Sequence, residues 1–281
     1  MKTRIIHGDD ITAAVAALIK EASFNLPPEV EKRFEEMILS ETTDTARETL
    51  GLLVKNGAIA AGEGLPLCQD CGIAIVFVEV GYGVVIDGDL DGAVNRGVEQ
   101  AYRVNYLRKS VVADPLRRNN TGTNAPAVVH VDHTGGDRLG LTVFLKGGGS
   151  ENMSSLKMFR PTATEEMILD HIEKTVIDAG PNPCPPLFLG VGIGGTADSA
   201  LLNAKKAVLR GPGTRHPDPC YAGLEDRILE RVNRTGIGPL GFGGRHTAAG
   251  VFIREAPTHI AMLPVALNLT CHSLRYRRSE L

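Results

Sequence analysis

The sequence lacks tryptophan altogether, and only 5% of its 281 residues are aromatic. It also lacks any apolar run of the ~18 residues that a membrane-spanning helix requires. The N-terminus begins basic, turns acidic at Asp9 and Asp10, and has no apolar segment of the kind found in secretory signals. We therefore expect a cytoplasmic protein with no membrane contact.

A strong charge of either sign is missing as well. The 30 Lys and Arg residues nearly balance the 33 Asp and Glu residues, which leaves a formal net charge of −3. Domains that bind nucleic acid usually carry a basic excess, so we expect no nucleic-acid partner. The content of 43% hydrophobic and 22% charged residues is ordinary for a folded chain, and the length allows a large core.

Cysteine is scarce, and the number of cysteines is odd. Five cysteines argue against a disulfide framework. Three of them lie far apart in loop contexts, at Cys68, Cys184 and Cys271. Three lone loop cysteines fit a metal cluster with an open iron better than a four-ligand zinc knot. Each could also be a small buried residue, and Cys220 has no distinguishing context.

Cys68 and Cys71 form a CxxC pair, which is typical of a zinc half-site or of a redox pair. A zinc site needs two further close ligands, and neither a second CxxC nor an HxxxH occurs. A redox pair usually opens a helix, whereas Cys71 leads into the apolar run 73–81. Both alternatives stay open, although we expect Cys71 to be a small buried residue.

The order of apolar patterns predicts an α/β fold. Periodic apolar residues predict helices over 11–23, 29–41, 43–62, 90–110, 163–180, 197–210 and 224–236. Apolar and β-branched runs predict strands over 73–81, 81–88, 127–134, 137–149 and 187–195. We expect a single compact unit of N-terminal helices followed by a mixed β-sheet with packed helices. No linker or repeat divides the chain, so residues 1–281 are expected to form one domain.

Three local patterns predict specific features of the backbone. The runs 127–134 and 137–149 are predicted to form a hairpin through Gly135 and Gly136. The helix 163–180 should have Thr162 or Thr164 as its cap and end at Gly180, as the capping rules require. Prolines on both sides of Cys184 are expected to hold its backbone extended and to fix the direction of its thiolate.

Two glycine-rich segments stand out. Residues 190–196, GVGIGGT, precede a predicted helix and resemble a phosphate-binding loop, but they lack the Lys-Ser/Thr ending and the GxGxxG spacing. The N-terminus of that helix would still attract an anion such as a carboxylate. Residues 146–152, KGGGSEN, form the second segment, which carries little weight alone.

Taken in order, several motifs resemble one family. They are PLCQDCG, LRKSVVADPL, NNTGTN, KGGGSEN, NPCPPLFLGVGIGGT, GIGPLGFGGR and PTHIAMLPVALNLTCH. Together they resemble the α subunit of the iron–sulfur-dependent hydro-lyases, class I fumarate hydratase and L(+)-tartrate dehydratase. The resemblance covers nearly the whole chain, from the first predicted helices to Cys271.

The resemblance implies a cofactor and a set of site residues. It implies a [4Fe–4S] cluster held by Cys68, Cys184 and Cys271, with one iron free of protein ligands. It implies catalytic roles for Asp70 in proton transfer and for His259 in substrate contact or proton transfer. It also implies that substrate is bound by Gln69, Arg108, Gly148 and Gly149. From the residues alone, Arg108 is as well explained as a solvated charge and His259 as a core histidine.

The implied activity is reversible addition of water to a C4 dicarboxylate, with fumarate hydration to malate as the leading reaction. L(+)-tartrate dehydration to oxaloacetate is the alternative. Single-chain relatives carry a second region with further catalytic and carboxylate-binding residues, so the resemblance implies a separate β subunit and an α2β2 assembly. Two rivals from other classes are a noncatalytic zinc-stabilised binding protein and a thiol redox protein.

Overall fold

The computed structural model describes residues 3–281, which divide into two compact units. Unit 1 comprises residues 3–27, 57–148 and 275–281, and unit 2 comprises residues 28–56 and 149–274. The expected α/β class, with N-terminal helices followed by mixed sheets and packed helices, is confirmed. The expectation of a single compact unit differs from the structure, because each unit encloses a hydrophobic core of its own.

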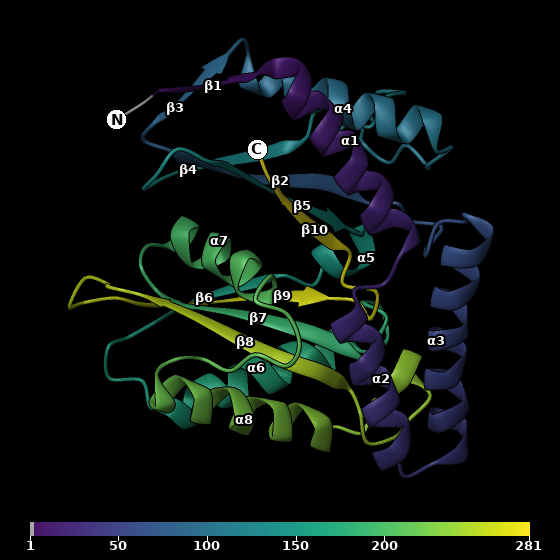
Figure 1. Ribbon diagram of the computed structural model, residues 1–281. Coiled ribbons are helices and arrows are strands. Elements are labelled where there is room, and N and C mark those ends of the chain that lie inside the picture. Colours follow the sequence, from purple (N-terminus) through teal and green to yellow (C-terminus); the bar gives the residue numbers. More distant parts are fainter. Residues whose placement is uncertain (1–2) are drawn as a thin grey trace. The chain divides into compact units, whose positions relative to one another are not determined.

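Unit 1 is built on a four-stranded sheet with the strand order β10-β5-β2-β4. Two helices pack on one face of this sheet (Figure 1), and a parallel pair of short strands, β1 and β3, accompanies them. The core lies between the helices and the sheet. The elements are β1 (Arg4–His7), α1 (Gly8–Phe24), β2 (Ile73–Gly81), β3 (Val84–Asp87), α4 (Leu90–Val104), β4 (Val128–Thr134), β5 (Leu139–Lys146) and β10 (Tyr276–Glu280).

The predicted hairpin between the fourth and fifth strands is wrong. Strand β2 lies between them, parallel to β4 and antiparallel to β5. The connection 135–138 crosses the end of β2, where Gly136 and Arg138 accept hydrogen bonds from the backbone N–H groups of Gly83 and Gly81. Gly135 and Gly136 therefore lie in a crossover connection rather than in a tight turn, because the almost wholly buried β2 lies between β4 and β5 in the sheet.

Unit 2 contains a second four-stranded sheet, with the order β6-β9-β7-β8. Helix α7 covers one face, and α6 and α8 cover the other (Figure 1). Helix α2 packs beside this sheet, where the rings of Phe34 and Phe188 lie 6.5 Å apart. The elements are α2 (Pro28–Ser40), β6 (Ser155–Phe159), α6 (Glu165–Ala179), β7 (Leu187–Gly194), α7 (Ala197–Val208), α8 (Pro219–Arg234), the 3-10 turn η1 (Pro239–Gly241), β8 (Ala248–Ala256) and β9 (Leu263–Thr270). Two helices have residues in both units, α3 (Asp44–Glu63) and α5 (Gly148–Glu151).

The glycines of the GVGIGGT segment allow a helix to pack closely against a strand. Gly190 and Gly192 lie in the fully buried strand β7. A Cβ atom at Gly190 would lie 1.9 Å from the carbonyl oxygen of Ala204, and one at Gly192 would lie 2.0 Å from that of Ala200. Only glycine allows α7 to approach the strand this closely. This contact explains the motif without any phosphate.

Helix ends agree with the sequence at one helix and differ at two others. Thr164 caps α6 by accepting a hydrogen bond from the N–H of Met167, and Gly180 ends the helix, as predicted. Helix α4 ends at Val104, six residues earlier than predicted. Helix α8 begins at Pro219 because Asp218 caps it. Among residues 3–281, no helix combines the length and apolarity needed to cross a bilayer.

Candidate active site

The Cys68 loop of unit 1 joins α3 to β2 and closes against the end of β5. Gly72 has φ +78°, and a Cβ atom there would lie 2.8 Å from the carbonyl oxygen of Lys146. A side chain at this position would be both strained and obstructed. The half-buried Cys68 therefore sits on a loop of fixed course, with its thiol donating toward Oε1 of the exposed Gln69 at 3.4 Å.

The carboxylate of Asp70 is held by two backbone groups. Its Oδ1 accepts a hydrogen bond from the N–H of Gly72 at 3.0 Å, and its Oδ2 accepts one from the N–H of Gly148 at 2.8 Å. The structure thus brings two predicted site residues, Asp70 and Gly148, into direct contact. A carboxylate fixed in this way has a defined orientation, which proton transfer to a substrate requires.

Cys71 is a structural residue, as expected from the sequence. It is 2% exposed, and its sulfur accepts a hydrogen bond from the N–H of Arg108 at 3.2 Å. The hydroxyl of Tyr102 donates to the carbonyls of Cys71 and Gly72 at 2.8 and 2.9 Å. Burial raises the pKa of the Cys71 thiol, so the thiol stays protonated at neutral pH.

Asn124 is a positioning residue that sequence reasoning missed. It is fully buried with φ +68°, and its Oδ1 accepts hydrogen bonds from the N–H groups of Ser110 and Val111 at 2.6 and 3.2 Å. Its Nδ2 donates to the carbonyl of Gly72 at 3.1 Å. Asn124 therefore ties the segment that follows the exposed Arg108 to the Cys68 loop. The motif NNTGTN contained it, but composition alone gave no reason to single out its last residue.

In unit 2, Cys184 follows the end of α6 in a strained turn. The extended backbone expected from its flanking prolines is wrong, because Cys184 has φ +57°. Its N–H donates to the carbonyl of Pro181 at 2.9 Å, which closes the turn. Left-handed conformations are costly for residues other than glycine and are found disproportionately at functional sites.

The loops of Cys184 and Cys271 are joined directly. The N–H of His272 donates to the carbonyl of Cys184 at 3.2 Å, and the ring Nδ1 of His272 lies 3.2 Å from the same oxygen. Cys184 is exposed, while Cys271 is half-buried with its sulfur 3.1 Å from the hydroxyl of Ser273. Unit 2 therefore brings two of the three predicted cluster cysteines to one end of its sheet.

The state of the cysteines fits an iron–sulfur donor set. None of the five forms a disulfide among residues 3–281, and the three predicted ligands are accessible thiols on loops. Within residues 3–281, no three or more His, Cys, Asp or Glu side chains gather around a position for one metal ion. A cubane cluster binds one thiolate at each ligated iron, so it does not require its cysteines to converge on a single ion.

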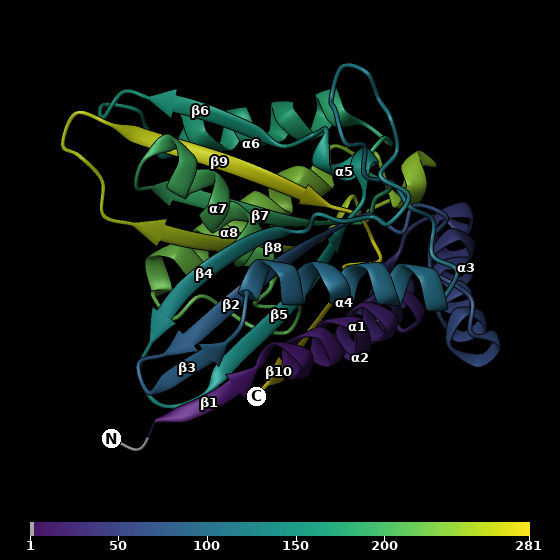
Figure 2. The same ribbon diagram turned by 90° about the horizontal axis from the view of Figure 1, so that it is seen from above.

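Within unit 2, His259 lies away from Cys184 and Cys271. It is exposed on the loop between β8 and β9, where its Nδ1 accepts a hydrogen bond from the N–H of Ala261 at 3.1 Å. This loop joins β8 to β9 (Figure 2). Cys271 follows the other end of β9 in the chain. The eight residues of β9 at ~3.3 Å each separate the two ends by roughly 26 Å. Unit 2 does not bring His259 to the cysteine end.

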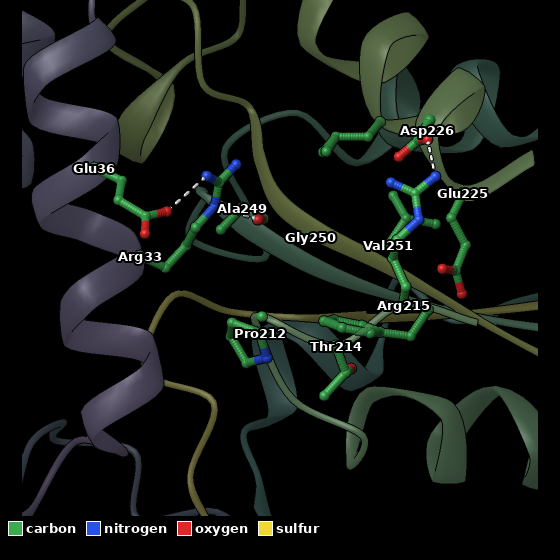
Figure 3. A pocket seen from close by; sticks show the side chains of 13 residues that line it. Arg33, Glu36, Pro212, Thr214, Arg215, Glu225, Asp226, Ala249, Gly250 and Val251 are labelled. Carbon is green, nitrogen blue, oxygen red and sulfur yellow. Dashed lines mark hydrogen bonds and ion pairs between the residues drawn. The ribbon is translucent and has the colours of Figure 1, made fainter. Parts of the chain in front are cut away.

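Two cavities of unit 2 involve none of the predicted site residues. The first, of about 200 Å³, lies between α2 and α8 (Figure 3). Its arginines are paired, Arg33 with Glu36 at 3.3 Å and Arg215 with Asp226 at 2.6 Å. The neighbouring cavity, of about 540 Å³, shares Arg33 and Asp226 with it. The charges of the arginines that line the first cavity are therefore compensated.

Comparison with known proteins gives a match that spans both units. A sequence model of the family described as "Fumarate hydratase (Fumerase)" matches residues 12–280. The "Putative L(+)-tartrate dehydratase subunit alpha" of Methanocaldococcus jannaschii is 40% identical over 267 residues, which cover 93% of this chain and 94% of that protein. The "L(+)-tartrate dehydratase subunit alpha" of Escherichia coli is 31% identical over 268 residues, which cover 94% of this chain and 88% of that protein. The protein of the same name from Shigella sonnei is 30% identical with the same coverage.

Proposed function

Because the chain belongs to the hydro-lyase family of fumarate hydratases and L(+)-tartrate dehydratase α subunits, we propose that it is the α subunit of an enzyme that dehydrates L(+)-tartrate to oxaloacetate. The observation that carries this proposal is the match with tartrate dehydratase α subunits along 93–94% of the chain. The sequence favoured fumarate as substrate, and the relatives favour the alternative instead.

Fumarate hydration remains the second candidate, because the matching family model carries the name of fumarate hydratase. Both reactions move water across two adjacent carbons of a C4 dicarboxylate. They differ in the additional hydroxyl of tartrate, so the same carboxylate-binding and proton-transfer groups would serve either substrate.

The proposal includes a [4Fe–4S] cluster with Cys68, Cys184 and Cys271 as its ligands. Support comes from the three cysteines, which form no disulfide among residues 3–281, and from the hydrogen bond that joins the Cys184 and Cys271 loops. A cluster with one iron free of protein ligands would supply a Lewis acid for the departing hydroxyl.

The side chains of unit 1 have distinct roles in this proposal. Asp70 moves the proton at carbon, and the N–H groups of Gly72 and Gly148 hold its carboxylate toward that task. Arg108 binds a substrate carboxylate through its planar fork of donors, and Gln69 adds a hydrogen bond. Both side chains are exposed and thus able to reach a ligand. Gly148 and Gly149 let the backbone approach the substrate, since neither has a Cβ atom.

His259 is proposed to act in proton transfer or substrate contact from a second copy of the chain. The length of β9 separates it from Cys271 in its own unit. The α2β2 assembly proposed here contains two copies, and a β subunit would cover the site and exclude water from it. The relatives are named alpha subunits, which supports such a partner.

Residues 1–281 are proposed to act as one catalytic domain, and the cytoplasmic location stays a prediction.

Anaerobic coexpression with a β-type partner tests the proposal. The purified complex should contain on the order of four irons and four sulfides per α chain. Its kcat/KM for L(+)-tartrate should exceed that for fumarate or malate. The reverse order would establish the second candidate. A complex that holds zinc and no sulfide, and turns over neither substrate, would instead support the noncatalytic binding protein.

A further inference from the structure

Arg275 is a buried cation that forms no ion pair among residues 3–281. It is 2% exposed, and within residues 3–281 its Nε has no hydrogen-bond partner. Other arginines with largely covered side chains are paired, for example Arg210 with Glu225 and Arg277 with Glu21. The ion pairs formed by the described part of the chain do not include Arg275.

The guanidinium of Arg275 lies beside the Asp70 loop. A Cβ atom at Gly147 would be 3.2 Å from Oδ2 of Asp70 and 3.6 Å from Nη2 of Arg275. Burial raises the pKa of the neighbouring Cys71 thiol, and the positive charge of Arg275 opposes that rise. A glycine that lacks a side chain thus separates the proposed proton-transfer carboxylate from an unpaired cation.

Such an arrangement is unfavourable for folding taken alone. A guanidinium removed from water without an anion costs free energy, and hydrophobic residues of similar volume usually replace such groups without loss. The position therefore makes physical sense when a bound anion lies against the guanidinium. The same low exposure would strengthen the attraction between the guanidinium and that anion.

We propose that Arg275 binds one carboxylate of the dicarboxylate substrate next to Asp70, an inference that rests on the proposed function. A substrate dianion at this position would otherwise face the negative charge of Asp70. Arg275 offsets that repulsion, and its fork of donors fits a carboxylate in two-point contact. Arg108 binds the other carboxylate, so the substrate is held at both ends.

Succinate is the probe for this inference, because it carries two carboxylates on four carbons but has neither a hydroxyl nor a double bond to react. Its dissociation constant is measured by calorimetry on the cluster-loaded α/β complex. Arg275→Met should raise this constant between about 10-fold and 100-fold, the range for a charged hydrogen bond. Arg275→Lys, which keeps the charge but loses the fork, should give a smaller rise.

Arg277→Met is the matched control, since Arg277 lies two positions further along the chain, in β10, and is already paired with Glu21. It should leave succinate affinity unchanged. Without succinate, Arg275→Met should unfold at a temperature no lower than the wild type, because it removes an unpaired buried charge. Iron and sulfide contents should also stay at the wild-type level.

Three results would overturn the inference alone: Arg275→Met binds succinate as tightly as the wild type, loses the cluster, or unfolds at a markedly lower temperature. The last two would assign the guanidinium to the cluster or to the fold. A wild-type complex that binds no succinate and turns over neither tartrate nor fumarate would refute the proposed function, and this inference with it. The two failures are therefore distinguishable.

Discussion

The carboxylate of Asp70 accepts a hydrogen bond from the backbone N–H of Gly148 at 2.8 Å. This contact joins the loop after α3 to the glycine-rich segment after β5, although 78 positions of sequence separate the two residues. It leaves Asp70 with a fixed carboxylate on the loop that carries Cys68. A role in proton transfer and a role in loop closure both follow from this geometry, and kinetics separates them.

Asp70→Asn should lower kcat by about 10²–10⁴-fold, the usual contribution of a general acid or base, with iron and sulfide unchanged. The amide keeps the size of the side chain but cannot exchange the proton. Asp137→Asn, at an exposed position of the same unit, is the control and should be silent. A small loss of kcat accompanied by a lower unfolding temperature would instead make Asp70 a structural carboxylate.

Serine substitutions should divide the five cysteines into two groups. Cys68→Ser, Cys184→Ser and Cys271→Ser should each abolish the cluster, because each of the three thiolates binds one iron and the cluster needs all three ligands. Cys71→Ser and Cys220→Ser should retain it, because Cys71 is buried against the N–H of Arg108 and Cys220 is exposed on the first turn of α8. Iron and sulfide analysis of anaerobically purified protein decides. Retention by Cys184→Ser together with loss by Cys71→Ser would contradict the ligand assignment.

Gly190→Ala should destabilise the protein by at least about 1–3 kcal/mol, as overpacking of a well-filled core does. The added carbon would lie 1.9 Å from the carbonyl oxygen of Ala204, so α7 would have to move away from β7. Gly51→Ala is the matched control: no atom lies within 4 Å of its new Cβ, and alanine favours the interior of α3. Urea unfolding measures both variants. Equal stability for Gly190→Ala would restore the ligand-loop interpretation of the motif.

Whether a structural feature could be predicted from the sequence depended on how far apart in the chain the interacting residues lie. Cap and end residues such as Thr164 and Gly180 act within one helix turn, and the sequence predicted them correctly. The placement of β2 between β4 and β5 depends on pairing between residues far apart in the chain. The short connection 135–138 indicated a hairpin instead. The packing role of Gly190 and Gly192 in β7 was not predicted for the same reason, since α7, the helix that requires them, lies outside the motif in the sequence.

The residues of the candidate site also fall into two groups, those found from the sequence and those found only in the structure. Cys68, Cys184, Cys271 and Asp70 were found through motifs that resemble a family. Arg275 was not, because nothing in the run LRYRR distinguishes this buried arginine from Arg277, which is half-buried, or from Arg278, which is exposed. Burial and a missing counterion are properties of the folded chain alone.

Glu41 should make the stability of unit 2 depend on pH. Burial alone raises its pKa, but the N–H groups of Arg245 and Thr42 donate to its carboxylate and hold its pKa below the ordinary value. The lowered folded-state pKa means that its contribution is complete above about pH 4.3 and is lost as the pH falls through the folded-state pKa. Glu41→Gln should cost about 1.5–3 kcal/mol near pH 7 and progressively less in acid. Glu36→Gln, on the exposed side of α2, is the control. A cost for Glu41→Gln that is independent of pH in urea unfolding from pH 7 to pH 3 would refute this account.

The last prediction concerns His259 and the number of chains that complete one site. Because β9 separates His259 from Cys271 by roughly 26 Å, we expect His259 to serve the cluster of a second copy. His259→Ala should therefore keep its cluster but lose turnover, whereas Cys271→Ser should lose its cluster but retain a competent histidine. When the two variants are coexpressed with the β partner, mixed assemblies contain sites with an intact cluster from one copy and an intact His259 from the other. Random pairing of two copies gives such sites a share of about one quarter, so activity should recover to about that fraction of the wild type. No recovery, in mixtures shown by mass spectrometry to contain both variants in one assembly, would remove His259 from the neighbouring site.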